Sequence, residues 1–262
     1  MVDPVGRVAV QWPAGSQAFQ AMTYDAVGRT TAAYVAYEPG WSSSSSSSGF
    51  GNAPNVEDSI VMEQREMAYD PAGNVLSTTL KQRYDSATGN GPLEDHETEP
   101  KARVSYVASY PDALGRTVAT ANYGTNDLFA TPWTRDVVIP GCSDDILVNH
   151  IAFNPAGEPY RTTDPMGAQT TRTWDAAARL IEEVQGRVPG RDMPALDRTT
   201  RYSYNSDGNV TILTALNNGG EEQHTQWVYG VIAGTGESAL YSNLLVSQKI
   251  YPDSVGGSDV VS

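Results

Sequence analysis

The sequence predicts an all-β protein, a repeat array of antiparallel β-hairpins that forms part of a spiralling β-shell. Three observations support this fold class. The 262 residues include 24 glycines, 16 prolines and 14 tyrosines, a composition typical of many turns between short strands. Residues 75–80 and 210–215 alternate between two faces, as half-buried strands do. One short motif recurs along the whole chain.

The motif is an aromatic residue, then Asp or Asn, then two or three residues, and in most copies Gly followed by Arg or Asn. A further partial copy starts at Tyr251. The residues expected to form the turns are Tyr24, Asp25, Gly28, Arg29, Tyr69, Asp70, Gly73, Tyr110, Asp112, Gly115, Arg116, Phe153, Asn154, Gly157, Trp174, Asp175, Arg179, Tyr204, Asn205 and Gly208.

Each copy has the chemistry of a hairpin turn. The Asp or Asn side chain can bond back to nearby backbone N–H groups, and Gly supplies the positive φ that closes a short loop. Residues 176–184 have some helix propensity, but they follow the motif at Trp174, so a hairpin is expected there.

The aromatic positions are separated by 45, 41, 43, 21, 30 and 47 residues. We interpret this spacing as a unit of about twenty residues in which some copies have decayed or carry insertions. The same motif resumes after every insertion, so residues 1–262 are expected to form a single continuous repeat region. Residues 42–48, seven consecutive serines, are expected to be a flexible loop insertion.

Charge and cysteine content exclude several classes. Lys and Arg number 17 against 31 Asp and Glu, a net charge of −14 that disfavours nucleic acid as a partner. No apolar run is long enough for membrane insertion by a helix. The single cysteine, Cys142, excludes an internal disulfide framework. Neither a metal site nor a cofactor is predicted.

The sequence gives little indication of catalysis, so the protein is not expected to be an enzyme. Asp164-Pro165-Met166-Gly167 is interpreted as a structural turn rather than a self-cleavage site, because no second copy follows it. His150 and His224 have no neighbouring nucleophile motif. His96 lies in an acidic loop that could hold a divalent cation but is expected to be only solvated. An alternative to a purely structural role is a carbohydrate-binding or cell-surface adhesion module, in which Trp41 and Trp133 would face sugar rings.

These residues resemble the Rhs/YD-repeat family, whose usual unit contains Tyr-Asp-x-x-Gly-Arg-Leu. The resemblance runs from Tyr24 to Tyr251, nearly the whole chain. The apolar residue after Gly-Arg is mostly lost here, as at Thr30 and Thr117, which departs from the family pattern.

The resemblance implies a long hairpin ribbon that winds into a hollow shell, with the repeat tyrosines stacked between neighbouring hairpins. In bacterial polymorphic toxins and insecticidal toxin complexes such a shell encloses a toxic domain, and in teneurins a related shell lies outside the cell. The chain is then expected to be a fragment of a larger secreted or cell-surface protein, with the targeting segment elsewhere. Its expected partners are the remainder of the shell and an enclosed or displayed domain, with cell-surface glycans under the alternative.

Overall fold

The computed structural model describes residues 1–13, 16–38, 56–125, 133–188, 197–216, 222–230, 246–252 and 258–261. Its secondary structure confirms the predicted all-β class: the single helix among these residues is the 3-10 turn Val56–Asp58. The chain divides into two compact units, Met1–Val148 and Asn149–Ser262, which are described separately. Trp41 and the serines at 42–48 lie outside the described residues.

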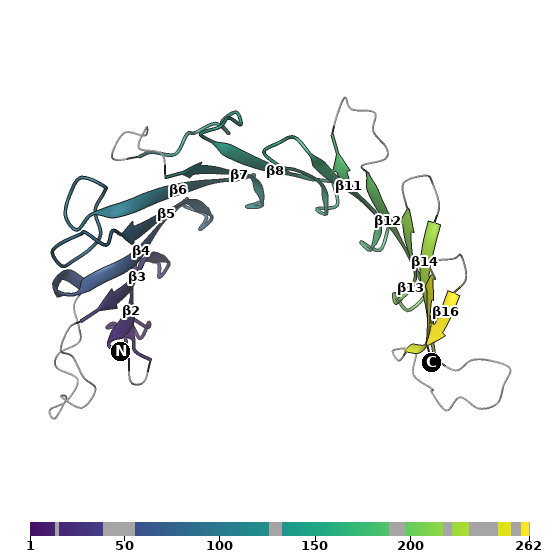
Figure 1. Cartoon of the computed structure of the whole chain (residues 1–262), viewed down its shortest axis with the longest axis horizontal. Coiled ribbons are helices and arrows are strands. Elements are labelled where there is room, and N and C mark those ends of the chain that lie inside the picture. The colour runs from purple at the N-terminus through teal and green to yellow at the C-terminus, as the bar shows by residue number, and fades with distance from the viewer. Residues whose placement is uncertain are drawn as a thin grey trace. The chain divides into compact units, whose positions relative to one another are not determined.

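The first unit is an antiparallel sheet in which each strand pairs with the next along the chain (Figure 1). Thr, Val, Tyr and Ala dominate these strands and suit a pleated, half-buried surface. The strands are β1 (Val10–Gln11), β2 (Ala18–Tyr24), β3 (Thr30–Tyr37), β4 (Ile60–Tyr69), β5 (Val75–Arg83), β6 (Ala102–Pro111) and β7 (Thr117–Gly124).

The second unit repeats this up-and-down pairing from strand to strand. Residues 176–184 belong to a hairpin turn and the strand after it, so the predicted hairpin is confirmed there. The strands are β8 (Leu147–Phe153), which begins at the end of the first unit, β9 (Pro159–Thr163), β10 (Gln169–Trp174), β11 (Leu180–Arg187), β12 (Arg198–Tyr204), β13 (Val210–Leu216), β14 (Glu222–Tyr229), β15 (Val246–Pro252) and β16 (Ser258–Val261).

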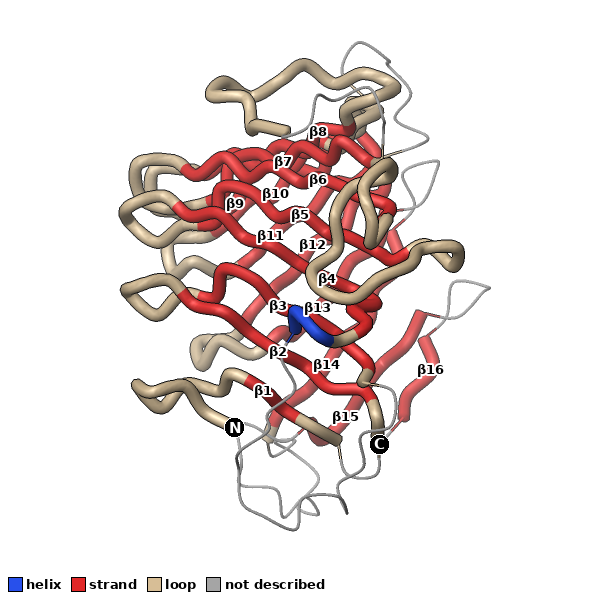
Figure 2. The backbone as a smooth tube through the Cα atoms, turned by 90° about the vertical axis from the view of Figure 1, so that its left-hand side faces the viewer, coloured by secondary structure: helices blue, strands red, loops and turns tan. Residues whose placement is uncertain are grey.

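Antiparallel pairing places successive turns at alternate ends of the strands, and this explains the irregular motif spacing. The turns after Tyr24, Tyr69 and Tyr110 lie at one end of the strands of the first unit, and those after Phe153, Trp174 and Tyr204 lie at one end of the strands of the second. The partial copy at Tyr251 precedes a connection at the other end, and the tan connections of Figure 2 show both ends. The connection at the opposite end is long after β3, β5 and β7 but is a tight turn at Asp164–Ala168. The spacings of 45, 41 and 43 residues therefore each contain one long connection, as expected for insertions. Asp164–Ala168 is a copy that has lost its aromatic residue.

In the first unit the buried side chains lie on one face of the sheet. Two clusters form there, one around Phe19 and Val61 and one around Tyr110 and Tyr123. The connection after β5 covers the first cluster with Leu93, whose backbone N–H donates to the buried Gln64 Oε1 at 2.6 Å. The long loops of this unit therefore complete its core.

On the matching face, the described strands of the second unit carry polar and charged side chains. Arg201 on β12 lies between Glu182 on β11 and Glu222 on β14, with its Nε 2.8 Å and its Nη1 3.5 Å from their carboxylates. His224 Nδ1 lies 2.9 Å from the hydroxyl of Thr214 on β13. Cross-strand polar pairs stabilise a sheet face that stays in contact with water.

The turn geometry confirms the predicted role of the motif glycines, and Gly208 with φ of 85° is representative. A Cβ at Gly208 would meet no atom within 4 Å, so the cost of adding one is backbone strain alone. The motif at Trp174 has Ala178 in this place, with φ of 59°. A non-glycine residue in the left-handed region is strained.

We therefore predict opposite effects for two small substitutions. Gly208→Ala should lower the free energy of unfolding by about 1 kcal/mol, and Ala178→Gly should raise it by up to about 1 kcal/mol. Gly141→Ala is the control, because Gly141 has no positive φ and open space at its Cβ position. Urea unfolding of the three variants measures these values, and a loss of stability in Ala178→Gly would contradict the strain argument.

Candidate functional site

The motif turns are locked by the side chain of their Asp. Asp25 Oδ1 accepts the backbone N–H of Val27 at 3.0 Å and that of Arg29 at 2.9 Å. Its Oδ2 accepts the Nε–H of Arg29 at 2.6 Å. The Asp side chain therefore satisfies the backbone donors that the turn exposes and holds the Arg side chain in one orientation.

The same lock recurs wherever the structure describes a motif turn. The acceptor oxygen takes the N–H groups two and four residues later at Asp112, Asn154, Asp175 and Asn205, and also at Asp164, which precedes a positive-φ glycine. Asp70 accepts the N–H of Asn74 at 2.8 Å. Asp164 lies in a turn of this kind, since its Oδ1 accepts two backbone N–H groups of the turn.

Sequence reasoning missed one turn of this kind at residues 3–7. Asp3 Oδ1 accepts the N–H groups of Val5 at 3.1 Å and Arg7 at 2.8 Å, and Arg7 Nε donates to Oδ2 at 2.6 Å. Val2 stands where the other copies have an aromatic residue, so a search anchored on aromatics passes over it. The residues Asp-Pro-Val-Gly-Arg carried the signal.

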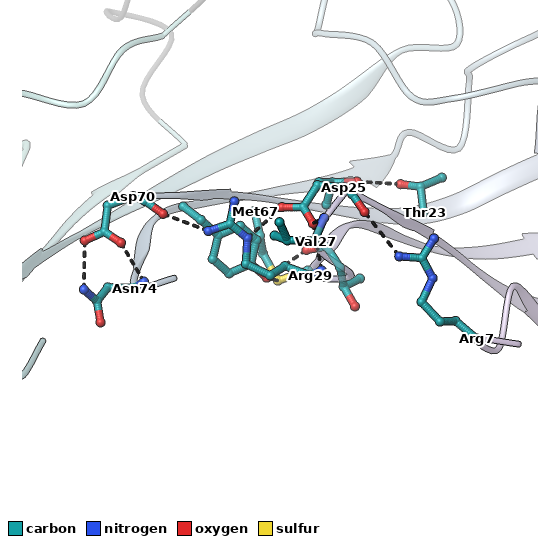
Figure 3. A network of polar contacts seen from close by, with 11 residues as sticks. Arg7, Thr23, Asp25, Val27, Arg29, Met67, Asp70 and Asn74 are labelled. Atoms are coloured by element: carbon teal, nitrogen blue, oxygen red, sulfur yellow. Dashed lines mark hydrogen bonds and ion pairs between the residues drawn. The ribbon is translucent and has the colours of Figure 1, made fainter. Parts of the chain in front are cut away.

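A second set of contacts, which we call the inter-turn clamp, joins one turn to the next. The guanidinium carbon of Arg29 lies 4.7 Å from the centroid of the Tyr69 ring, and Arg29 Nη1 donates to the backbone carbonyl of Asp70 at 2.8 Å. In return, Tyr69 Oη donates to the carbonyl of Thr30 at 2.8 Å. Figure 3 shows the Arg side chains bridging from turn to turn. Each clamp thus joins the Arg of one motif to the aromatic ring of the next and to the backbone carbonyl that follows that aromatic.

Two further clamps have the same geometry. Arg7 lies 4.4 Å from the Tyr24 ring, and Tyr24 Oη donates to the Val8 carbonyl at 2.7 Å. Arg179 lies 4.6 Å from the Tyr204 ring, and Tyr204 Oη donates to the Leu180 carbonyl at 2.6 Å. The tyrosines therefore stack on the arginine of the preceding hairpin, and the guanidinium attraction for the ring adds to the hydrogen bonds.

The copy at Tyr110 does not form this clamp. An extra residue, Pro111, separates Tyr110 from Asp112, and because side chains alternate along a strand, Tyr110 turns to the opposite face. It is 5 % exposed in the core, where Arg135 lies 4.8 Å from its ring centroid. Asn74, at the Arg position of the preceding turn, instead places its Oδ1 against Gly115.

Two motif copies carry other aromatics. Trp174 keeps the tyrosine's hydrogen bond, because its indole Nε1 donates to the carbonyl of Pro159 at 3.3 Å. Phe153 has no hydroxyl to donate. The hydrogen-bonding half of the clamp therefore depends on which aromatic occupies the position.

The turn carboxylates are held in their charged form. The side-chain amide of Asn74 lowers the pKa of Asp70, and the guanidinium of Arg116 lowers that of Asp112. The backbone N–H of Arg179 lowers the pKa of Asp175. For Asp25, partial desolvation raises the pKa, but the N–H and guanidinium of Arg29 together outweigh it and the net shift is downward. These shifts follow from hydrogen bonds to the ionised form.

Trp133 is expected to face sugar rings if the protein binds carbohydrate. Trp133 is half-buried and stacks on Tyr106 with centroids 4.8 Å apart, and its contact with Tyr123 is edge-on at 5.0 Å. One face of its indole is therefore occupied by protein.

Among the residues that the structure describes, no group of three His, Cys, Asp or Glu side chains is placed to hold a metal ion. No helix in the described ranges is long and apolar enough to cross a membrane.

The fold and the clamp define a class: a hairpin-repeat β-protein whose recurring residues join neighbouring turns. No protein-family model and no curated protein matches the chain. Among solved structures, TcdB2-TccC3-Cdc42 is similar at 11 % identity and a TM-score of 0.33, over 89 % of this chain. TcdB2-TccC3 is similar at 14 % identity and a TM-score of 0.36, over 86 %.

A Tc holotoxin pore of Photorhabdus luminescens is similar at 13 % identity and a TM-score of 0.22, over 98 % of this chain and 17 % of the other. The chain spans 12 % of the two TcdB2-TccC3 chains. The structural neighbours are thus Tc toxin chains, at TM-scores too low to establish a shared fold.

The lowered pKa values predict a specific dependence of stability on pH. A carboxylate with a depressed folded-state pKa stabilises the fold fully above the unfolded value of about 3.9, and this contribution is lost as the pH falls through the folded-state pKa. Asp175→Asn keeps the acceptor oxygen, as Asn154 and Asn205 do naturally, but removes the charge. Its Tm should be below that of the wild type at pH 7, and the difference should shrink as the pH falls below 4.

Thermal unfolding followed by circular dichroism between pH 2 and 7 measures the difference. Asp207→Asn is the control, because Asp207 is exposed at a turn tip and its carboxylate takes no part in the turn lock. A Tm difference for Asp175→Asn that stays constant over this pH range would show that the turn charge does not contribute.

Proposed function

We propose that this chain is a non-catalytic structural scaffold, a segment of a large secreted or cell-surface YD-repeat shell that encloses or displays another domain. The observation that carries the proposal is the inter-turn clamp. Its Arg and Tyr recur in the sequence, and the recurring Asp holds that Arg in place. We call the motif turns that share one end of the strands the turn row. The motif therefore has a structural use, with no bound ligand needed to account for it.

The clamp suits a scaffold energetically because it joins neighbours only. An exposed cation–π contact contributes about 0.5–1 kcal/mol and a typical hydrogen bond about 0.5–1.5 kcal/mol. Each link is modest, but a repeat array sums one such interface for every adjacent pair. A long ribbon can be stabilised in this way without a single large core.

The resemblance to YD-repeat proteins supports the finer part of the proposal. The resemblance implies two partners, the remainder of the shell and the enclosed or displayed domain. The net charge of −14 is compatible with a well-solvated shell exterior. The scaffold acts by excluding proteases and solvent components from what it encloses, so its activity is steric.

Protease protection in the native protein, including the polypeptide that flanks this chain, tests the proposal. Arg29→Ala with Arg179→Ala removes two clamps, while Arg103→Ala with Arg198→Ala removes two exposed strand arginines of the same charge. Thermolysin should cleave the enclosed domain at least about tenfold faster in the clamp variant, because the rate follows the open population. The control should match the wild type.

Two results would oppose this function. Equal and rapid cleavage of the flanking domain in the wild type and both variants would mean that the chain shields nothing. Slow cleavage that is unaffected by loss of the clamps would mean that any shielding does not depend on the turn row.

A further inference from the structure

Two methionines occupy the same position relative to a clamp tyrosine. Met22 lies two residues before Tyr24 on β2, and Met67 lies two residues before Tyr69 on β4, so each pair shares one face of its strand. In both pairs the methionine Sδ is 3.6 Å from the tyrosine Oη. Met67 and the neighbouring turn residues are labelled in Figure 3.

Each tyrosine hydroxyl has one proton and two acceptors within reach. The carbonyl of the preceding hairpin is the closer one, at 2.7 Å for Tyr24 and 2.8 Å for Tyr69. A thioether sulfur is a weak acceptor, so the proton belongs to the carbonyl and the clamp stays closed. Which acceptor takes the tyrosine proton therefore depends on whether the sulfur is a thioether or has been oxidised.

We propose that Met22 and Met67 are oxidation sites through which a peroxide loosens the Arg7–Tyr24 and Arg29–Tyr69 clamps. The thioether loses two electrons and gains an S=O bond, while hydrogen peroxide loses one oxygen and leaves as water. The sulfoxide is polar, and its oxygen accepts the tyrosine proton that otherwise goes to the preceding hairpin. Reduction of the sulfoxide restores the thioether, so the modification is reversible.

The position beside a clamp tyrosine distinguishes these two half-buried methionines from two exposed ones. Met62 on β4 is 50 % exposed and Met166 in a tight turn is 90 % exposed. Both are open to a peroxide, but neither stands two residues before a clamp tyrosine. Tyr202 occupies the matching place before Tyr204, so the clamp of the second unit has no methionine and should not respond.

The test compares two double variants in a Cys142→Ser background. One carries Met22→Leu and Met67→Leu, and the control carries Met62→Leu and Met166→Leu. Leu conserves the volume of Met, and the serine removes the exposed thiol from the reaction. The full chain is treated with hydrogen peroxide, sulfoxides are located by peptide mass spectrometry, and Tm is measured by circular dichroism. The background protein and the Met62/Met166 variant should lose about 2–6 °C, the shift expected for one or two lost hydrogen bonds in a chain of this size. The Met22/Met67 variant should lose less than half of that.

A second variant keeps the proposal falsifiable if the first folds poorly. Tyr24→Phe with Tyr69→Phe removes the two hydroxyls, so oxidation of Met22 and Met67 should then change Tm by less than half as much. An undiminished fall in this variant would show that oxidation acts through packing and would overturn the proposal. Full oxidation of Met22 and Met67 without a fall in Tm, or their resistance while Met62 and Met166 react, would also overturn it.

Discussion

The hydrogen bonds that the turn Asp makes to its own backbone are the constraint on which the rest of the turn row depends. They fix the turn, and through the Asp–Arg pair they fix the direction of the guanidinium. Only then can Arg29 reach both the Tyr69 ring and the Asp70 carbonyl, 41 residues along the chain. An exposed ion pair contributes little stability by itself. Its larger effect here is to orient a side chain for contacts with the next hairpin.

The two units combine this turn row with different sheet faces. In the first unit long connections bring Leu93 and Trp133 over the sheet, and the buried side chains beneath them are mostly apolar. In the second unit the described strands carry Glu182, Arg201 and Glu222 on the matching face. In the first unit the long connections cover the apolar face, which would otherwise remain exposed to water. The turn row is the part that both units share.

Much of the fold could be predicted because the motif is local. Asp or Asn followed by a positive-φ residue specifies a hairpin from neighbouring residues alone, and this holds even where Ala178 replaces glycine. The pairing of Arg29 with Tyr69 could not be predicted, since it depends on which turns share an end of the strands. Spacing alone cannot separate a long loop from a decayed repeat. Tyr110 shows a further limit: one inserted residue, Pro111, sends an aromatic to the opposite face. The turn at Asp3 was missed only because its aromatic is absent.

A double-mutant cycle on Arg29 and Tyr69 tests the central claim most directly. The free energy of unfolding is measured for Arg29→Ala, Tyr69→Leu and the double variant, with Arg29→Ala and Tyr110→Leu as the control pair. Coupling of about 0.5–1.5 kcal/mol between Arg29 and Tyr69 is predicted, with the control pair additive within about 0.5 kcal/mol. Additive effects of Arg29→Ala and Tyr69→Leu would mean that the two side chains lie together without joining the hairpins, and would contradict the account.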